Sequence, residues 1–332
     1  MTSLIHDLSN PAVLPDKTQN VSVVQTHIST VFVADAFVYK VKKAVNFGFL
    51  DFSTLEKRAH YCRQEVALNK RLSEDVYLGV LPITYDGKIH RLGGGQGEVV
   101  DYAVKMRRLP EEKLMKSMFE KGKLKSEDLH NIARVIAEFH QKALRSPEIE
   151  KYGEPEAFKI NTDENFEQTT KYINATIEKE DFDLLRQWTN HFFDQNKALF
   201  YQRIEDGKVR DCHGDLHMEH ICLLDPIAII DCIEFNDRFR YMDMLGDIAF
   251  LLMDLEFREA KELSEGLWQV YAELTGSGDM EALLNFYKVY RAYVRGKVMS
   301  FQLDDEMIEP REKEIAAQIA RNYFKLACGY IK

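Results

Sequence analysis

Alternating apolar and polar positions dominate the first hundred residues of the chain. This period predicts strands at residues 22–26, 30–33, 36–43, 80–85, 88–92 and 99–106. One helical pattern interrupts them, because Ser53 and Glu56 form a capping box and apolar positions then recur every three or four residues to about Ser73. The first part of the chain therefore predicts an antiparallel sheet accompanied by a single helix.

From Pro110 onward the apolar positions follow a helical period. Helices are expected at 126–140, 165–206, 243–253, 257–275, 280–300 and 308–331. Residues 146–165 contain Pro147, Gly153 and Pro155 and are expected to form a loop. The fold class is α+β, with a sheet-containing unit at residues 1–108 and a larger, mainly helical unit at residues 109–332.

Two lysines stand on one face of the predicted strand at 36–43. Alternation places Lys40 and Lys42 together and Lys43 on the opposite face. Glu65 lies on the apolar face of the following helix and needs a cation, because an unpaired buried charge is costly. We expect Glu65 to pair with Lys40 or Lys42. The alternative is an edge strand whose lysines face solvent, with a glutamate at the rim of the helix.

The stretch from Asp211 to Asp231 carries the candidate chemistry. Residues 221–224 and 227–230 are expected to form a hairpin, which would place His220 roughly opposite Asp231. Asp215 precedes the hairpin in His213-Gly-Asp-Leu-His217. Two carboxylates and an imidazole around one small volume suit a metal ion and a general base.

Two other stretches receive structural interpretations. The glycines at 93–97 are expected to form a hairpin turn rather than a phosphate loop, because no Lys-Ser/Thr pair and no helix follow them. Asp243 and Asp247 begin an apolar helix. They are expected to be helix-start carboxylates that brace the loop around Asp215.

Composition narrows the class of protein. The 332 residues have a net charge of −10, which argues against nonspecific nucleic-acid binding. We find neither a membrane span nor a signal peptide in the sequence. The five cysteines form no Cys-x-x-Cys pair, so we expect reduced thiols and a cytoplasmic protein.

The order of lysine strand, glutamate helix, hinge, helices, His-x-Asp loop, hairpin and aspartate resembles the protein-kinase-like fold. Within that fold, His213-Gly-Asp-Leu-His217 followed by Ile229-Ile-Asp231 resembles the aminoglycoside/choline phosphotransferase family. Asn46-Phe-Gly-Phe-Leu-Asp-Phe52 is similar to a bacterial subgroup that is often fused to a P-loop kinase domain, which we do not expect in this chain. The resemblance implies a bilobal fold with a small antiparallel-sheet N-lobe and a larger helical C-lobe.

The resemblance also implies roles for individual residues. Asp215 matches the catalytic aspartate, which receives or orients the proton of the substrate hydroxyl, and Asp231 matches the magnesium-binding aspartate. Lys40, with Lys42 as second choice, matches the lysine that holds the α- and β-phosphates. Glu65 matches the helix glutamate that pairs with this lysine.

Two further segments concern the nucleotide. Residues 106–110, which include Met106 and Arg108, match the hinge whose backbone receives adenine. The loop at 26–30 lacks the glycines that bring backbone close to phosphates, so Ser29, Thr30 or His27 would substitute.

His220 stands where the family usually has asparagine as a second magnesium ligand. It would favour manganese, contact the metal through water, or reduce the metal count to one.

The sequence thus predicts an ATP- or GTP-dependent phosphotransferase that uses Mg²⁺ or Mn²⁺ and a small-molecule hydroxyl acceptor. It predicts neither a nucleic-acid partner nor a membrane. A second interpretation is a nucleotide-binding regulatory pseudokinase, because of His220 and the glycine-poor loop. A third is a metal-dependent hydrolase that uses His213, His217, His220 and Asp231.

Overall fold

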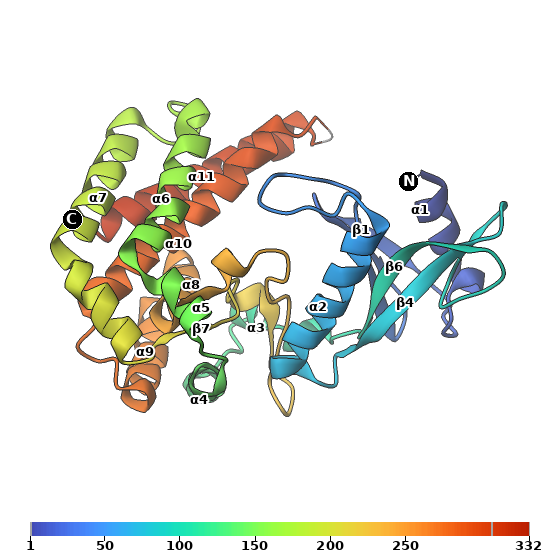
Figure 1. The fold of residues 1–332 in the computed structure, drawn as a ribbon, viewed down its shortest axis with the longest axis horizontal. Coiled ribbons are helices and arrows are strands. Elements are labelled where there is room, and N and C mark those ends of the chain that lie inside the picture. The colour runs from blue at the N-terminus through green and yellow to red at the C-terminus, as the bar shows by residue number, and fades with distance from the viewer. Residues whose placement is uncertain (1, 307, 332) are drawn as a thin grey trace. The chain divides into compact units, whose positions relative to one another are not determined.

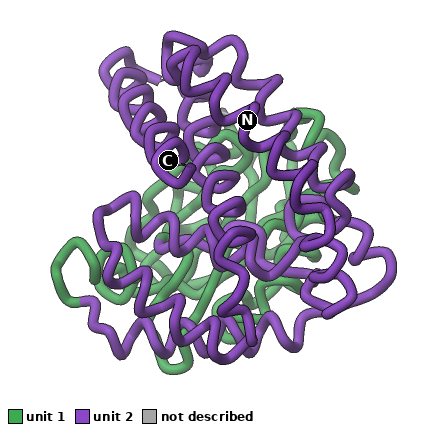
Figure 2. The backbone as a smooth tube through the Cα atoms, turned by 90° about the vertical axis from the view of Figure 1, so that its left-hand side faces the viewer, with its two compact units in different colours: residues 1–123, 219–237 green, residues 124–218, 238–332 purple. Residues whose placement is uncertain are grey.

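The computed structural model describes residues 2–306 and 308–331 of the chain. The chain divides into two compact units, each formed by two separate stretches (Figure 2). The first unit contains residues 1–123 and 219–237, and the second contains residues 124–218 and 238–332. The first unit thus extends past the predicted boundary after residue 108 and takes in a short later stretch. Backbone contacts explain this: Leu223 donates to the carbonyl of Lys113 at 2.8 Å, and Leu114 forms a β-bridge with Cys222.

A six-stranded antiparallel sheet with the order β1-β2-β3-β6-β4-β5 forms the centre of the first unit (Figure 1). Its strands are β1 (Ser22–Gln25), β2 (Ser29–Val33), β3 (Phe37–Lys42), β4 (Tyr77–Tyr85), β5 (His90–Leu92) and β6 (Glu98–Arg107). The predicted strands are therefore confirmed, with ends that shift by a few residues. Helix α1 (Thr2–Leu8) and helix α3 (Met115–Glu120) complete this part of the unit.

The two faces of this sheet belong to different cores. Ala103 packs in a cluster with Leu8, Phe32 and Tyr39, whereas its neighbour Val104 packs in a cluster with Cys62 of α2 (Leu55–Ser73). Successive strand residues point to opposite faces, so α2 covers one side of the sheet. That side is also the one to which Lys40 and Lys42 point.

Helix α2 begins one residue later than the sequence predicts. The N-cap is Thr54, whose hydroxyl accepts the N–H of Lys57 at 3.3 Å. The predicted cap residue Ser53 instead donates its hydroxyl to the carboxylate of Asp51 at 2.5 Å. The local competition between a serine and a nearby aspartate therefore moves the cap by one position.

The glycine-rich segment at 93–97 is not a hairpin turn, which corrects that prediction. β5 and β6 lie on opposite sides of β4, so the segment passes from one side of that strand to the other. Gly97 has a φ of +119°, and a Cβ atom there would lie 2.2 Å from the carbonyl oxygen of Tyr85. The glycine is required by this close approach of two backbones.

The later stretch of the first unit contains the predicted hairpin, with its register shifted by one residue. β8 (Ile221–Cys222) pairs with β9 (Ala228–Ile229), and Ile221 lies opposite Ile229. The N–H of Ile230 donates to the carbonyl of His220 at 2.9 Å. His220 is therefore opposite Ile230 rather than Asp231, because the two strands are joined by five residues instead of a tight two-residue turn.

The second unit is mainly helical. Its helices are α4 (Ser126–Lys142), α5 (Pro147–Glu150), α6 (Pro155–Thr169), α7 (Lys179–Glu205), α8 (Met244–Phe257), α9 (Lys261–Thr275), α10 (Glu281–Phe301) and α11 (Pro310–Gly329). Two short strands, β7 (Val209–Asp211) and β10 (Tyr241–Asp243), pair with each other. With the sheet of the first unit, these helices confirm the α+β class.

The loop predicted at 146–165 is wrong. Most of it is helical, because Pro147 and Pro155 occupy the first turns of α5 and α6. Proline is tolerated there, since the first N–H groups of a helix have no partner inside it. Phe158 and Phe166 of α6 are buried and anchor the helix.

Helix α8 forms the centre of the second unit. Every residue from Met244 to Leu255 is buried, and Phe250 and Met253 pack in one cluster with Tyr293 of α10 and Phe324 of α11. Burial on all sides explains why residues 244–255 are apolar except for Asp247 and Asp254, whose carboxylates accept backbone N–H groups. Among the described residues, none of the helices has the combined length and apolarity needed to cross a membrane.

Candidate active site

The two strand lysines share one glutamate, whereas the sequence predicts a pair of Glu65 with either Lys40 or Lys42. Nζ of Lys40 lies 3.0 Å from Oε1 of Glu65, and Nζ of Lys42 lies 2.6 Å from Oε2. The side chain of Glu65 is fully buried. Burial would raise the pKa of Glu65, but Lys40 and Lys42 together lower it. One buried carboxylate therefore holds both cations.

Lys42 has a second carboxylate partner that the sequence interpretation missed. Glu234 forms an ion pair with Lys42, and the side chains are only 4% and 1% exposed. Burial would lower the pKa of Lys42, but Glu234 and Glu65 raise it above its usual value. The sequence did contain a signal for Glu234, because it stands between the apolar residues Ile233 and Phe235. Glu65 was identified by the same feature, a carboxylate among apolar residues.

Lys40 contacts the aspartate that follows the hairpin. Its Nζ lies 2.7 Å from Oδ1 of Asp231. The side chain of Lys40 is 15% exposed and that of Asp231 is 42% exposed, so this pair is more open than that of Lys42 and Glu234. Burial would lower the pKa of Lys40, but Asp231 and Glu65 raise it. The first unit therefore brings together Lys40, Lys42, Glu65 and Asp231.

His220 also lies beside Asp231. It ends the short 3₁₀ turn Met218–His220, and its Nε2 lies 3.6 Å from Oδ2 of Asp231. The other carboxylate oxygen is the one that contacts Lys40. An imidazole and a lysine thus approach the same aspartate through different oxygens.

Asp215 lies in the second unit, on the loop that follows β7. Its carboxylate is one-third exposed, and Nε2 of His217 lies 3.6 Å from its Oδ2. Its N–H donates to Nδ1 of the buried His213 at 3.3 Å. His213 therefore holds the backbone of the loop.

Asp247 braces this loop from α8, as predicted. Its carboxylate accepts the N–H of His213 at 2.8 Å and the N–H of Gly214 at 2.9 Å. Arg291 of α10 donates to the carbonyl of Gly214 at 2.8 Å. The backbone before Asp215 is thus fixed from two buried helices. The other predicted brace, Asp243, caps α8 by accepting the N–H of Leu245.

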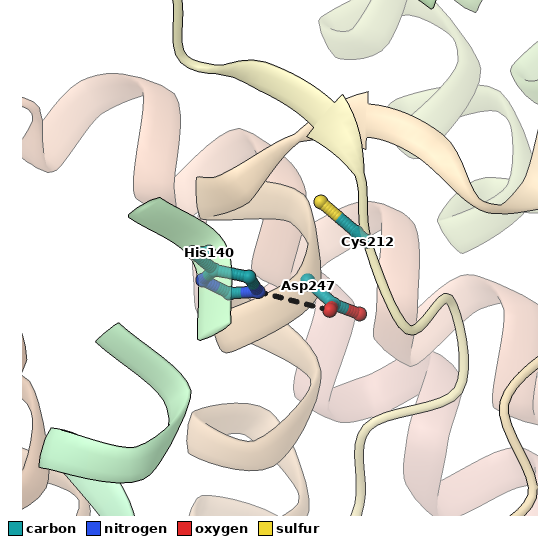
Figure 3. Close-up of side chains that lie close together, drawn as sticks. All are labelled: His140, Cys212 and Asp247. Atoms are coloured by element: carbon teal, nitrogen blue, oxygen red, sulfur yellow. Dashed lines mark hydrogen bonds and ion pairs between the residues drawn. The ribbon is translucent and has the colours of Figure 1, made fainter. Parts of the chain in front are cut away.

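His140 of α4 supports Asp247 in turn (Figure 3). Its Nε2–H donates to Asp247 at 3.1 Å, and its Nδ1 lies 2.8 Å from the hydroxyl of Tyr271. Burial would raise the pKa of Asp247, but the interaction with His140 lowers it to about 2. Cys212 lies beside this pair, yet the polar atoms of His140 and Asp247 are occupied by the fold. The group acts as a support for the loop rather than a metal site.

The remaining predicted nucleotide contacts are all in the first unit. Ser29 lies opposite Lys42 in the pairing of β2 and β3, and its buried hydroxyl has no hydrogen-bond partner among the described residues. Met106 continues β6 opposite Val38. The N–H of Arg108 already donates to the carbonyl of Ala36 at 2.9 Å. The predicted hinge therefore begins within the sheet.

Comparison with known proteins places this geometry in context. The model of the phosphotransferase enzyme family matches residues 38–283. Uncharacterized proteins of Mycobacterium bovis and Mycobacterium tuberculosis are 35% identical over 279 residues, which is 84% of this chain and 54% of theirs. The chain thus spans about half the length of these curated relatives.

Solved structures share the fold at low sequence identity. A choline/ethanolamine kinase family protein from Mesorhizobium loti has a TM-score of 0.54 at 12% identity, covering 99% of this chain and 98% of its own. A putative aminoglycoside phosphotransferase from Ralstonia eutropha has a TM-score of 0.52 at 13% identity, covering 96% and 95%. The amicoumacin kinase hAmiN, in complex with AMP-PNP, Ca²⁺ and Ami, has a TM-score of 0.53 at 11% identity, covering 92% and 88%. Since the family model spans most of the sequence, this chain belongs to the phosphotransferase enzyme family, and its fold is the protein-kinase-like fold.

Proposed function

We propose that this protein is a small-molecule kinase that transfers the γ-phosphoryl group of ATP or GTP to a hydroxyl group. The observation that carries the proposal is the contact of Lys40 with both Glu65 and Asp231 in the first unit. A lysine held by a helix glutamate beside a partly exposed aspartate is the arrangement that phosphoryl transfer requires for phosphate and metal.

Lys40 is the lysine that grips the phosphates in this proposal. Lys42 is buried between two glutamates, so its charge is already balanced by the protein. Lys40 is more exposed, and its second partner Asp231 is the most exposed member of the group. A phosphate can reach Lys40 by replacing Asp231, whereas reaching Lys42 would require opening a buried ion pair.

The charges around Asp231 favour a divalent cation. The cluster contains two lysines and three carboxylates, with a formal sum of one negative charge: Lys40, Lys42, Glu65, Asp231 and Glu234. Asp231 would hold the ion, with His220 as a second ligand. A carboxylate and an imidazole fit Mn²⁺ better than Mg²⁺, which prefers oxygen. When bound, the ion supplies positive charge to the phosphates.

Asp215 is the proposed base. Its partly exposed carboxylate would accept the proton of the acceptor hydroxyl, whose oxygen forms the new bond to phosphorus while the nucleoside diphosphate leaves. His213, Asp247 and Arg291 fix the backbone on its N-terminal side, so the carboxylate needs little reorganisation.

A second candidate function is a nucleotide-binding regulator without turnover. The loop between β1 and β2 favours it, because Thr26 accepts the N–H groups of Ile28 and Ser29 at 3.4 and 3.0 Å. Those donors are therefore satisfied inside the loop instead of facing phosphates. Nucleotide binding without transfer would suit such a protein.

Two measurements on the purified protein separate these functions. Calorimetric titration with ATP and GTP, in Mg²⁺ or Mn²⁺, measures binding, and formation of the nucleoside diphosphate with a panel of hydroxyl acceptors measures transfer. Acceptor-dependent turnover that Asp215→Asn abolishes supports the kinase. Tight binding with no turnover supports the regulator, and absence of any nucleotide binding overturns both.

A further inference from the structure

The backbone of Asp231 has an unusual conformation for its residue type. Its φ is +63°, in the left-handed region that residues with a side chain rarely occupy. Such a conformation costs about 1 kcal/mol or more, and it persists where surrounding contacts hold it. Two buried side chains of the first unit contact the backbone of this segment.

Tyr77, the first residue of β4, makes one of these contacts. Its hydroxyl accepts the N–H of Asp231 at 3.1 Å, and its side chain is almost fully buried. The ring packs in the core that α2 shares with the sheet, among Cys62 and Val104. The position of the hydroxyl is therefore fixed by packing.

Asn69 of α2 makes the second contact. Its Oδ1 accepts the N–H of Cys232 at 2.9 Å, and its Nδ2 donates to the carbonyl of Glu65 at 2.9 Å. One partner is a donor and the other an acceptor, so the orientation of the amide is defined. Asn69 is buried, and its two hydrogen bonds satisfy a group that would otherwise be costly there.

The two side chains therefore hold consecutive N–H groups, those of residues 231 and 232. Asn69 lies one helical turn after Glu65, so the helix that binds Lys40 through Glu65 also binds the segment of Asp231. Movement of α2 away from the sheet would release both connections together.

We propose that Asn69 and Tyr77 are positioning residues that hold Asp231 in its left-handed conformation and so direct its carboxylate to the metal. The proposal deepens the proposed function and rests on it for the identity of the ligand. In this proposal the two residues act through the backbone N–H groups of Asp231 and Cys232 rather than as ligands of phosphate or metal.

Tyr77→Phe tests the hydroxyl without changing the shape of the core. We expect the Mn²⁺ concentration that half-saturates ATP binding to rise about threefold to tenfold, the effect of one lost hydrogen bond on the site. ATP affinity measured in EDTA should stay within about twofold, because Lys40 and Glu65 remain in place. Asn69→Leu should act in the same direction, and the double variant should exceed either single change.

Tyr102→Phe is the matched control. Tyr102 packs at the edge of the same core, and its hydroxyl makes no hydrogen bond among the described residues. It should leave the Mn²⁺ requirement unchanged. If Tyr77→Phe lowers the urea midpoint of unfolding but leaves the Mn²⁺ requirement unchanged, the residue is merely structural and the proposal is overturned.

Hydrogen exchange on the unmodified protein provides a test that needs no variant. The amides of Asp231 and Cys232 should exchange at least about tenfold more slowly than exposed loop amides. Rapid exchange of both amides would overturn the proposed clamp. If the protein binds no nucleotide, the proposed function fails, while this exchange measurement still decides whether Asn69 and Tyr77 hold the segment.

Discussion

Nζ of Lys40 lies 2.7 Å from Oδ1 of Asp231, although the two residues are 191 positions apart in the chain. The pair joins the third strand of the sheet to the segment that follows the hairpin. In the proposed function these groups bind different ligands, phosphate and metal. Binding of a metal–nucleotide complex must therefore exchange one ion pair for two new interactions, while Glu65 keeps Lys40 in place.

Asp231→Asn should remove metal-dependent nucleotide binding. The amide keeps the shape of the side chain but loses the charge that a divalent ion needs. We expect the enhancement of ATP affinity by Mn²⁺ to fall at least about tenfold in calorimetric titrations. Asp225→Asn, an exposed change within the same hairpin, is the control and should bind like the unmodified protein. Unchanged metal-dependent affinity in Asp231→Asn would contradict the assignment.

Asp215→Asn should spare nucleotide binding and remove transfer. The loop is held by His213 and Asp247 through backbone groups, so the substitution leaves its shape intact. We expect kcat to fall by a factor of about 10² to 10⁴, the usual contribution of a general base. Activity assays with an identified acceptor measure this, and the exposed change Asp206→Asn is the control. Retained turnover would exclude Asp215 as the base.

The parts of the candidate site that depend on local sequence patterns could be predicted from the sequence. Alternation placed Lys40 and Lys42 on one face, and helical spacing placed Glu65 opposite them, because both periods are fixed by backbone geometry. The helix-start position of Asp247 likewise pointed to its bracing role, whereas Asp243 caps the helix. These inferences needed no knowledge of how distant segments meet.

Features that depend on contacts between distant segments could not be predicted from local patterns. Asn69 and Tyr77 contact residues more than 150 positions away, and nothing in their own segments marks them as functional. The hairpin register depended on the conformation of a five-residue connection, which placed His220 opposite Ile230. Helix α6 was missed because the stretch around Pro155 has the composition of a loop, and burial of its aromatic residues decides its conformation.

The two lysines of β3 should differ in their effect on stability. Lys42→Met leaves two buried carboxylates without their shared cation, which costs about 3 kcal/mol or more. Lys40→Met should reduce ATP affinity with a smaller loss of stability, because Lys40 is more exposed. Urea unfolding at pH 7 measures the difference, with Lys43→Met, directly after the strand, as control. Equal destabilisation by both variants would contradict their separate roles.

The loss of stability caused by Lys42→Met should also depend on pH. Burial raises the pKa of Glu234 above that of a free glutamate, so as the pH falls Glu234 takes up a proton before a free glutamate would, which removes its charge. In the Lys42→Met variant, the stability deficit relative to the unmodified protein should therefore shrink toward pH 5. A deficit that is constant between pH 8 and pH 5 would mean that lost packing, rather than uncompensated charge, causes the destabilisation.

Asp247 should make the free energy of unfolding depend on pH in the acidic range. Its pKa in the fold is about 2, below the value of 3.8 for a free aspartate, so its contribution is full above pH 4. The contribution, about 2 kcal/mol, is lost as the pH falls from 4 toward 2, because the unfolded chain then binds more protons. Asp247→Asn should flatten the unfolding free energy over this range. Asp51, a partly exposed carboxylate with a similarly lowered pKa, provides the control, because 0.5 M NaCl should weaken its ion pair with Lys57 but not the buried contacts of Asp247.

His220→Asn should change the choice of metal. His220 approaches Oδ2 of Asp231, the oxygen that does not contact Lys40, so in the proposed function it can share an ion with that carboxylate. Replacing the imidazole nitrogen by an amide oxygen favours Mg²⁺, which prefers oxygen ligands. The ratio of the half-saturating Mg²⁺ and Mn²⁺ concentrations for ATP binding should fall about tenfold. His191→Asn on α7 of the second unit is the control, and an unchanged ratio in His220→Asn would show that the imidazole does not contact the metal.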